Sequence, residues 1–246
     1  MLFRSKFLAL CSTSATAGRP AQHTPPGVCA ERSVGGTFFI IYVCHHMNSV
    51  CKVAILIDGG YFTKRFKSIN RREVNIADIQ PFLDDVMNKV QAISPQSVTD
   101  ILFRSFYYDC RPFAEVKNRP DGRRIDFSQN QKFKTGTSFQ RDLKTFPQMA
   151  LRLGTLSFDG WKIDPKDPSK LIPDFKQKAV DMKIGLDIAW MSSKRTIDKL
   201  VLVAGDSDFV APMKFARKEG IWVYLCALGQ ANIKMELKEH ADFILQ

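Results

Sequence analysis

The chain has 246 residues, 45% of them hydrophobic, and a formal net charge of +11. It is long enough for one α/β domain with a full core and an appended segment. No run of about 18 uncharged apolar residues is present, which excludes a predicted membrane span, and the six cysteines lack zinc-binding spacing. The positive charge favours a polyanionic partner, with a generic basic surface as the alternative.

Residues 1–46 differ in composition from the rest of the chain. They hold four basic residues against one acid, Glu31, and many serine, threonine, glycine and proline residues. Three interpretations compete: a mitochondrial transit peptide, a disordered tail, or upstream sequence read from an early start codon. We favour Met47 as the functional start, so residues 1–46 are expected to be a disordered or non-native extension and residues 47–246 the domain. Scattered cysteines indicate a reducing compartment, the cytoplasm.

The first half of the domain begins with a continuous apolar run at 53–57, as expected for a strand covered on both faces. Gly59 and Gly60 permit a tight turn into a helix that begins at Tyr61. Apolar residues recur at helical spacing over 76–90, and a second strand is predicted at 100–108. The polar, basic stretch 111–137, which contains prolines and glycines, is predicted to be a long loop.

The second half continues the alternation. Helices are predicted at 139–153, 178–191 and 209–218, with strands at 155–163, 199–204 and 221–228. Residues 164–173 are predicted to form a proline-broken loop. Asn232 is predicted to cap a short helix that ends at Glu239, followed by an edge strand at 243–245. Such alternation predicts an α/β fold of three layers with a mostly parallel sheet.

Carboxylates follow two of the predicted strands. Asp58 ends the first strand, and Asp206 and Asp208 follow the strand at 199–204 through Gly205. Acids at the carboxyl edge of a parallel sheet face its crevice, where they repel one another unless a cation joins them. This pattern predicts a divalent-metal site for phosphodiester hydrolysis, and the alternative is that these acids cap helices or turns. Asp58-Gly-Gly lacks the spacing of either glycine-rich phosphate-binding motif, so no nucleotide cofactor is expected.

A third group of charges lies on the helix predicted at 178–191. At 3.6 residues per turn Lys178 and Asp181 share a face, whereas Asp187 points to a different side and should not reach the same cation. The alternative is a solvated helix face with local ion pairs. No Ser-His-Asp or Cys-His set competes with the acids, because His240 stands alone near the C-terminus.

The stretch 111–137 carries many cations, which contact phosphates without reading sequence. Phe113, Phe127 and Phe133 are interleaved with them and, if exposed, could stack on unpaired bases. The alternative is that these rings cover the core. The residues predicted to bind RNA, including two lysines near Asp181, are Arg119, Arg123, Arg124, Lys132, Lys134, Lys178 and Lys183.

Three separated motifs carry a family resemblance. Ile-Leu-Ile-Asp-Gly-Gly-Tyr-Phe at 55–62, Lys-x-x-Asp-x5-Asp at 178–187 and Val-Ala-Gly-Asp-Ser-Asp-Phe at 203–209 occur in this order. Together they resemble the NYN domain family, LabA-like branch, of the PIN-like nuclease superfamily. The resemblance implies a three-layer PIN-like (Rossmann-like) fold and an acidic cluster that binds Mg²⁺ or Mn²⁺ for RNA cleavage. By that resemblance the cluster is Asp58, Asp181, Asp206 and Asp208, and Asp187 matches a less secure further acid.

The sequence therefore predicts a metal-dependent ribonuclease, an endoribonuclease acting on single-stranded RNA. Asp58 and Asp208 are the first candidates for direct metal ligands. The alternatives are a non-catalytic RNA-binding or regulatory module with a PIN-like fold and a metal-dependent phosphatase of small phosphoesters. The expected partners are RNA and, as one option, a second copy of the chain in a homodimer, with no membrane partner.

Overall fold

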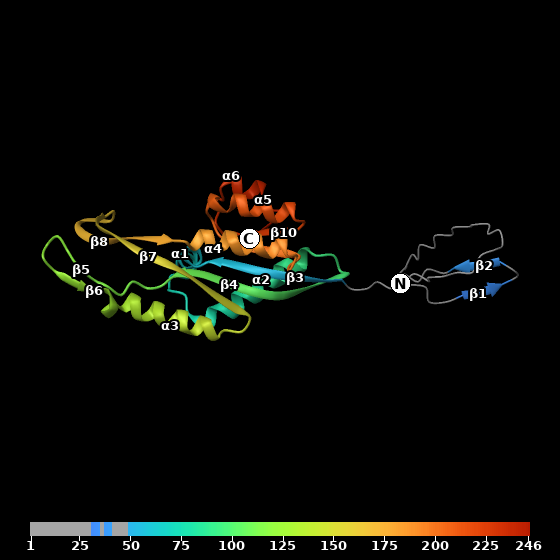
Figure 1. Cartoon of the computed structure of the whole chain (residues 1–246), viewed down its shortest axis with the longest axis horizontal. Helices are drawn as coiled ribbons and strands as arrows, with labels where there is room; N and C mark the ends of the chain where they lie inside the picture. The colour runs from blue at the N-terminus through green and yellow to red at the C-terminus, as the bar shows by residue number, and fades with distance from the viewer. Residues whose placement is uncertain (1–30, 35–36, 41–48) are drawn as a thin grey trace. The chain divides into compact units, whose positions relative to one another are not determined.

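A computed structural model of the chain describes residues 31–34, 37–40 and 49–246. The chain divides into two units, Met1–Met47 and Asn48–Gln246. In the first unit, β1 (Glu31–Val34) pairs with β2 (Thr37–Ile40) in antiparallel fashion (Figure 1). The expected disordered or non-native extension at 1–46 falls mainly on residues outside the described ones, so it stays a prediction.

The second unit is built on a seven-stranded sheet of order β11-β10-β9-β3-β4-β7-β8. Every neighbouring pair is parallel except β7 with β8, which confirms the mostly parallel sheet predicted from sequence. The strands are β3 (Ser49–Asp58), β4 (Val98–Cys110), β7 (Met149–Asp164), β8 (Asp167–Lys178), β9 (Lys199–Val203), β10 (Trp222–Cys226) and β11 (Phe243–Leu245).

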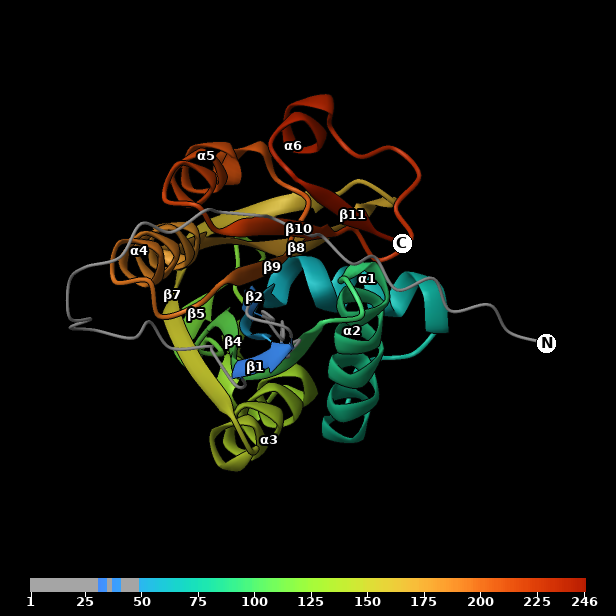
Figure 2. The same ribbon diagram turned by 90° about the vertical axis from the view of Figure 1, so that its right-hand side faces the viewer.

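Helices cover both faces of this sheet, so the fold has three layers (Figure 2). One face packs against α4 (Val180–Ser193), α5 (Val210–Lys218) and α6 (Met235–Glu239); the other packs against α1 (Gly59–Asn70), α2 (Ile79–Ile93) and α3 (Gln131–Thr145). Along β3, Ala54 and Leu56 belong to the first core and Val53, Ile55 and Ile57 to the second. The apolar run is continuous because both sides of the strand are buried. None of the described helices is long and apolar enough to cross a membrane.

Two sequence predictions between residues 139 and 173 were wrong. The predicted loop at 164–173 is instead a tight turn followed by β8, and the predicted helix at 139–153 divides between the end of α3 and the start of β7. Pro168 and Pro173 misled the prediction, since proline usually breaks a strand. β8 is an edge strand, where a residue without an N–H is tolerated.

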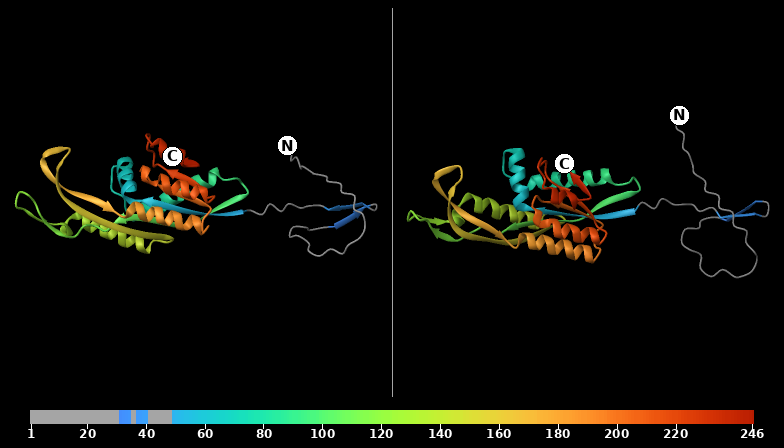
Figure 3. Two further views of the ribbon diagram at one scale, coloured as in Figure 1. Left: turned by 45° about the horizontal axis from the view of Figure 1, so that its top comes forward. Right: turned by 90° about the horizontal axis from the view of Figure 1, so that it is seen from above.

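β7 and β8 also extend past the sheet. Only residues 149–154 of β7 pair with β4, whereas 155–164 pair with β8 alone. The two strands therefore form an arm that continues beyond the carboxyl end of β4 (Figure 3). Part of the predicted loop at 111–137 lies beside it as a small hairpin, β5 (Val116–Asn118) with β6 (Arg124–Asp126), followed by η2 (Phe127–Gln129) and the first turns of α3.

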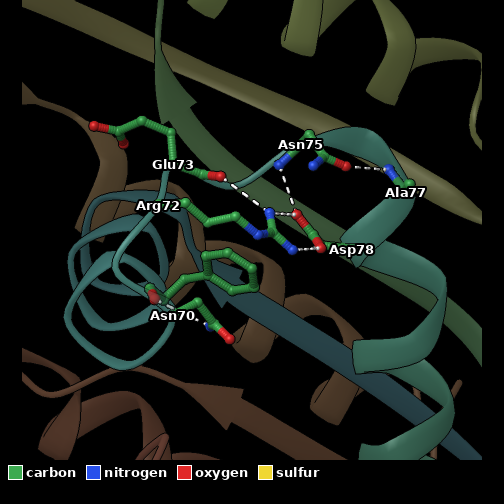
Figure 4. Close-up of polar contacts among 7 residues, drawn as sticks. Asn70, Arg72, Glu73, Asn75, Ala77 and Asp78 are labelled. Carbon is green, nitrogen blue, oxygen red and sulfur yellow. Dashed lines mark hydrogen bonds and ion pairs between the residues drawn. The ribbon is translucent and has the colours of Figure 1, made fainter.

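The connection between α1 and α2 is closed by a polar cluster (Figure 4). Arg72 donates two hydrogen bonds to the Asp78 carboxylate, at 2.7 and 2.5 Å, and they hold the pKa of Asp78 below its usual value. Asp78 and Asn75 form a capping box around η1 (Ile76–Asp78). The cluster fixes the start of α2 and thereby supports one face of the sheet.

Candidate functional site

Asp58 lies at the carboxyl end of β3 and begins α1. Its Oδ1 accepts a hydrogen bond from the Tyr61 N–H at 3.2 Å, so this carboxylate does cap the helix. Burial raises the pKa of Asp58, the hydrogen bond from Tyr61 opposes that rise, and the negative charge of Asp181 adds to it. A cap on its own would gain from ionisation near a helix N-terminus. The raised pKa shows that burial and a second acid act against that charge.

Asp181 reaches the same region from the first turn of α4. Helix α4 follows β8 almost directly, because Ala179 turns the chain with a left-handed φ of 67°. Burial raises the pKa of Asp181, and the charges of Asp208 and Asp206 raise it further. Asp181 is therefore coupled to Asp58 on one side and to the turn after β9 on the other.

Asp206 and Asp208 lie on that turn, around η3 (Ser207–Phe209). Asp206 occupies the N-cap position without a capping hydrogen bond within the described chain. Instead, Lys234 Nζ lies 3.2 Å from Asp206 Oδ1 and 3.0 Å from Ser207 Oγ. Burial acts to raise the pKa of Asp206, but the hydrogen bond and charge of Lys234 outweigh it, and the pKa lies below its usual value.

A close contact between two glycine-containing turns holds these segments together. A Cβ placed at Gly205 would lie 2.4 Å from the Tyr61 ring, so only glycine allows the turn after β9 to rest on that ring. The Tyr61 hydroxyl donates to the carbonyl of Ala227 at 2.7 Å and contacts Gln230 Oε1 at 2.9 Å. Tyr61 thus ties the Asp58 turn to both the Asp206–Asp208 turn and the segment after β10.

The four acids come from three segments of the chain and share one electrostatic environment. All their possible metal donors are carboxylate oxygens, which suit a hard cation such as Mg²⁺ or Mn²⁺. In the described residues, however, no three Asp, Glu, His or Cys side chains are arranged to ligate one ion. The set therefore fits a divalent cation in chemical kind, and side chains on the exposed turns have to move to close around it.

The comparisons with known proteins show the family of the chain. The sequence matches the NYN domain over residues 52–245. The chain belongs to the NYN domain family. This is a family of nuclease-type domains whose members generally use divalent metals, and it confirms that part of the resemblance seen in the motifs. No curated protein matches the chain.

Two solved structures are similar to this NYN domain at low identity. A protein of unknown function from Vibrio parahaemolyticus is 18% identical, with 79% of this chain and 91% of that chain covered and a TM-score of 0.41. The nicotinamidase of Staphylococcus aureus is 13% identical, with 79% and 98% covered and a TM-score of 0.32. Both likenesses are too weak to carry an argument about the site.

Two residues of the second motif lie in other surroundings in the NYN domain. Asp187 Oδ2 accepts a hydrogen bond from the Tyr108 hydroxyl at 2.8 Å and pairs with Arg152 Nε at 3.1 Å. These contacts tie α4 to β4 and β7, which is a packing role. The prediction that Lys178 shares a helix face with Asp181 was wrong, since Lys178 ends β8 and α4 begins at Val180.

The predicted RNA-binding cations divide into two groups. Arg119 is mostly buried, pairs with Asp121 at 3.3 Å and lies 5.6 Å from the Trp161 ring centroid; Arg123 also faces Asp121, at 3.7 Å. Lys183 is half-buried. The exposed cations, which are available to a phosphate backbone, are Arg123, Arg124, Lys132, Lys134 and Lys178.

Two of the three phenylalanines predicted as stacking surfaces pack inside the protein. Phe127 is buried, and its ring lies 5.4 Å from that of Phe113 and 5.4 Å from that of Phe175. The alternative that they cover a core therefore holds for Phe113 and Phe127. Phe133, on α3, is half-buried and belongs to none of the ring pairs in the described chain.

Sequence reasoning missed three residues at this edge of the NYN domain. Lys234 pairs with Asp206, and no local pattern around it signals that role. Gln177 lies against the Asp58 turn, since a Cβ placed at Gly60 would lie 3.1 Å from its Oε1. Asp109, near the end of β4, accepts a hydrogen bond from Gln140 at 2.8 Å, and burial raises its pKa. The rule that found Asp58, an acid where a buried strand ends, would also have found Asp109.

Proposed function

We propose that this NYN domain is a divalent-metal-dependent ribonuclease that hydrolyses phosphodiester bonds of single-stranded RNA, and that it belongs to the LabA-like branch of the PIN-like superfamily. The observation that carries the proposal is the mutual repulsion of acids from three segments at one sheet edge. Burial and neighbouring carboxylates raise the pKa values of Asp58 and Asp181. Keeping acids close to one another costs free energy, because their negative charges repel. This indicates a function that needs their combined negative charge.

The residues proposed to hold the metal are the same four acids. Asp58 and Asp208 would bind it directly, with Asp181 and Asp206 completing the shell or acting through water, because Mg²⁺ keeps several waters and uses few carboxylates. Mg²⁺ or Mn²⁺ bound there would supply a water of lowered pKa and neutralise charge on the phosphate.

Other residues of the chain would orient the RNA strand. Lys178 is exposed at the end of β8, immediately before the turn that carries Asp181. Lys132 and Lys134 are exposed on the first turns of α3. Such cations contact phosphates without regard to sequence and would direct the backbone towards the acids. Lys234 keeps Asp206 ionised and in place through its hydrogen bond.

The direct test is cleavage of a labelled single-stranded RNA by the full chain with Mg²⁺ or Mn²⁺. Asp58→Asn and Asp208→Asn should each reduce the cleavage rate on the order of 100-fold, because each removes charge that stabilises the transition state. Asp85→Asn is the matched control, since Asp85 is an exposed acid of α2 paired with Lys89. Equal rates in all four proteins would refute the proposal.

The second candidate is a non-catalytic RNA-binding module, which the exposed cations and the absence of a closed metal cluster in the described residues favour. Salt-sensitive RNA binding without cleavage in either metal would select it. Turnover of a generic phosphomonoester without RNA cleavage would select a small-molecule phosphatase instead.

The proposal includes a homodimer and a cytoplasmic location. Met182, Leu186 and Trp190 share one face of α4 and are 65%, 61% and 57% exposed, as a self-association surface would be. The described cysteines are free thiols, which suits a reducing compartment. Light scattering of the full chain and of Trp190→Glu tests the dimer: a dimeric wild type with a monomeric variant supports it, and a monomeric wild type contradicts it.

A further inference from the structure

A cavity of about 1040 Å³ lies beside the acidic edge, between the β7–β8 arm, the 112–127 segment and α3. The arm exists only because β7 and β8 continue ten or so residues past the last pairing with β4. The cavity is at the upper end of the usual volumes for ligand sites, and none of the four acids lines it. It is therefore a separate compartment next to the proposed metal site.

One wall of the cavity is a fixed aromatic cluster. Phe113, Phe127, Trp161 and Phe175 line it, with ring centroids of successive neighbours 5.1 to 6.1 Å apart. The Trp161 Nε1–H is held by the carbonyl of Asn118 at 2.9 Å. These rings pack on one another with neighbouring planes inclined by 27 to 76°, so they form a closely packed aromatic wall that is not flat.

The lining of the cavity also includes an unengaged ring and two cations, of which Arg119 lies 5.6 Å from the Trp161 ring centroid. Phe133 lines the cavity from α3, next to the exposed Lys132. The side chain of Arg119 is only 19% exposed, yet its Nε has no hydrogen-bond partner within the described chain. A buried N–H without an acceptor is costly, and an acceptor on a bound ligand would satisfy it.

Gln177 connects the cavity with the acids. It lines the cavity, and a Cβ placed at the neighbouring Gly60 would lie 3.1 Å from Gln177 Oε1 and 3.4 Å from Asp58 Oδ1. Thr63, whose hydroxyl donates to the Gly59 carbonyl at 2.7 Å, lines the cavity beside it. Gln177 and Asp58 thus both lie next to Gly60, and Gln177 borders the cavity on that side.

We propose that this cavity receives an unpaired nucleobase of the RNA strand, next to the phosphate that lies over the acids. The proposal rests on the proposed function for its choice of RNA. Phe133, the cavity-lining ring that belongs to no ring pair in the described chain, suits base stacking, which tolerates any base. Arg119 supplies a donor for an acceptor on the base edge, and Lys132 lies where the adjoining phosphate would pass. A paired base cannot enter, so the cavity selects single-stranded over duplex RNA.

The test is the affinity of the full chain for a fluorescein-labelled 12-nucleotide single-stranded RNA, measured by anisotropy in EDTA so that no cleavage occurs. Phe133→Ala should weaken binding about 10-fold, within the range of 1–3 kcal/mol for one stacked base. A fully abasic strand of the same length should bind the wild type about 10-fold more weakly than the RNA does, and Phe133→Ala should bind the two strands equally. Phe133→Leu keeps the apolar volume, guards against misfolding and should behave as Phe133→Ala does.

Two controls separate base recognition from general effects. Phe103→Ala removes an exposed phenylalanine of β4 and should leave the affinity unchanged. Lys132→Ala should weaken binding more than Lys144→Ala, although both remove one cation from α3. Unchanged affinity in Phe133→Ala, or equal binding of the RNA and the fully abasic strand by the wild type, would overturn the cavity proposal. The binding assay contains no metal and does not depend on catalysis. A wild type that fails to cleave RNA overturns only the proposed nuclease. A wild type that cleaves RNA, together with a Phe133→Ala variant that binds RNA as tightly as the wild type, overturns only the cavity proposal.

Discussion

The two edges of the sheet place their charged groups in opposite ways: the amino edge holds a buried ion pair, and the carboxyl edge holds one half-buried and three exposed acids. Near the amino ends of the strands, Lys199 Nζ lies 2.6 Å from Asp100 Oδ1, with side chains 6% and 0% exposed. The Ser94 hydroxyl lies 2.5 Å from both side chains. At the carboxyl edge, Asp58, Asp181 and Asp208 have no ion-pair partner within the described chain, Lys64 acts on Asp58 only through its charge, and Lys234 engages Asp206.

The difference distinguishes charged groups that stabilise the fold from charged groups that serve a ligand. A buried acid that serves the fold is matched by a base, because an uncompensated buried charge is costly. Acids that raise one another's pKa values contribute nothing of this kind to stability. At the carboxyl edge, the protein's own basic groups therefore do not neutralise the negative charge of these acids, and a bound cation would do so.

The largest expected effect is at the amino edge. Lys199→Met should lower the free energy of unfolding by about 3–5 kcal/mol, because it leaves the Asp100 carboxylate buried without its partner. Urea unfolding measures it. The double variant Lys199→Met/Asp100→Leu should recover most of the loss, and a loss below 1 kcal/mol in the single variant would show that the pair is not buried as described.

Divalent metal should stabilise the carboxyl edge and leave the amino edge unaffected. Mg²⁺ at about 100 times its dissociation constant should add about 2.7 kcal/mol to the free energy of unfolding. The gain should vanish in Asp58→Asn/Asp208→Asn and persist in Lys199→Met/Asp100→Leu. Thermal unfolding with and without Mg²⁺ checks this, and equal gains in both double variants would mean that metal binds elsewhere.

The Gly205 contact belongs to the carboxyl edge only, where it holds two acid-bearing turns together. Gly205→Ala should cost about 1–3 kcal/mol, because the new Cβ would overlap the Tyr61 ring. RNA cleavage should fall together with stability, as the Asp206–Asp208 turn is displaced. Gly122→Ala is unsuitable as a control because φ is positive there, whereas Gly136→Ala meets only Pro112 at 3.2 Å and should cost less.

The smallest expected effect is on the pH dependence of stability. Asp58 and Asp181 have raised pKa values in the folded chain, so their contribution to stability is present at low pH and is lost as pH rises through the raised values. Asp206, with its lowered pKa, contributes in the opposite sense: its stabilisation is present above the unfolded pKa and lost as pH falls.

Urea unfolding between pH 3 and pH 7 measures these slopes. Asp58→Asn/Asp181→Asn should reduce the loss of stability with rising pH, and Lys234→Met should reduce the opposing contribution of Asp206. A wild type and double variant with parallel pH profiles would show that the acids are not coupled.

Much of this site could be predicted from the sequence because the signals are local. Asp58 and Asp206–Asp208 directly follow buried strands, and topology then places them at one edge. Lys234 and Gln177 could not be found this way, since they reach the acids through tertiary contacts. The β7–β8 arm was missed because Pro173 is compatible with a strand only at a sheet edge, and edge position is a property of the whole fold.

The central claim is that acids from three segments jointly hold one hard cation. The most direct measurement is the anomalous difference map of crystals grown with Mn²⁺. The account predicts a peak within ligand distance of Asp58 and Asp208 carboxylate oxygens, with Asp181 and Asp206 in its inner or water-mediated shell. A protein saturated with Mn²⁺ in solution that shows no peak at this edge, or a peak only at other acids, would contradict it.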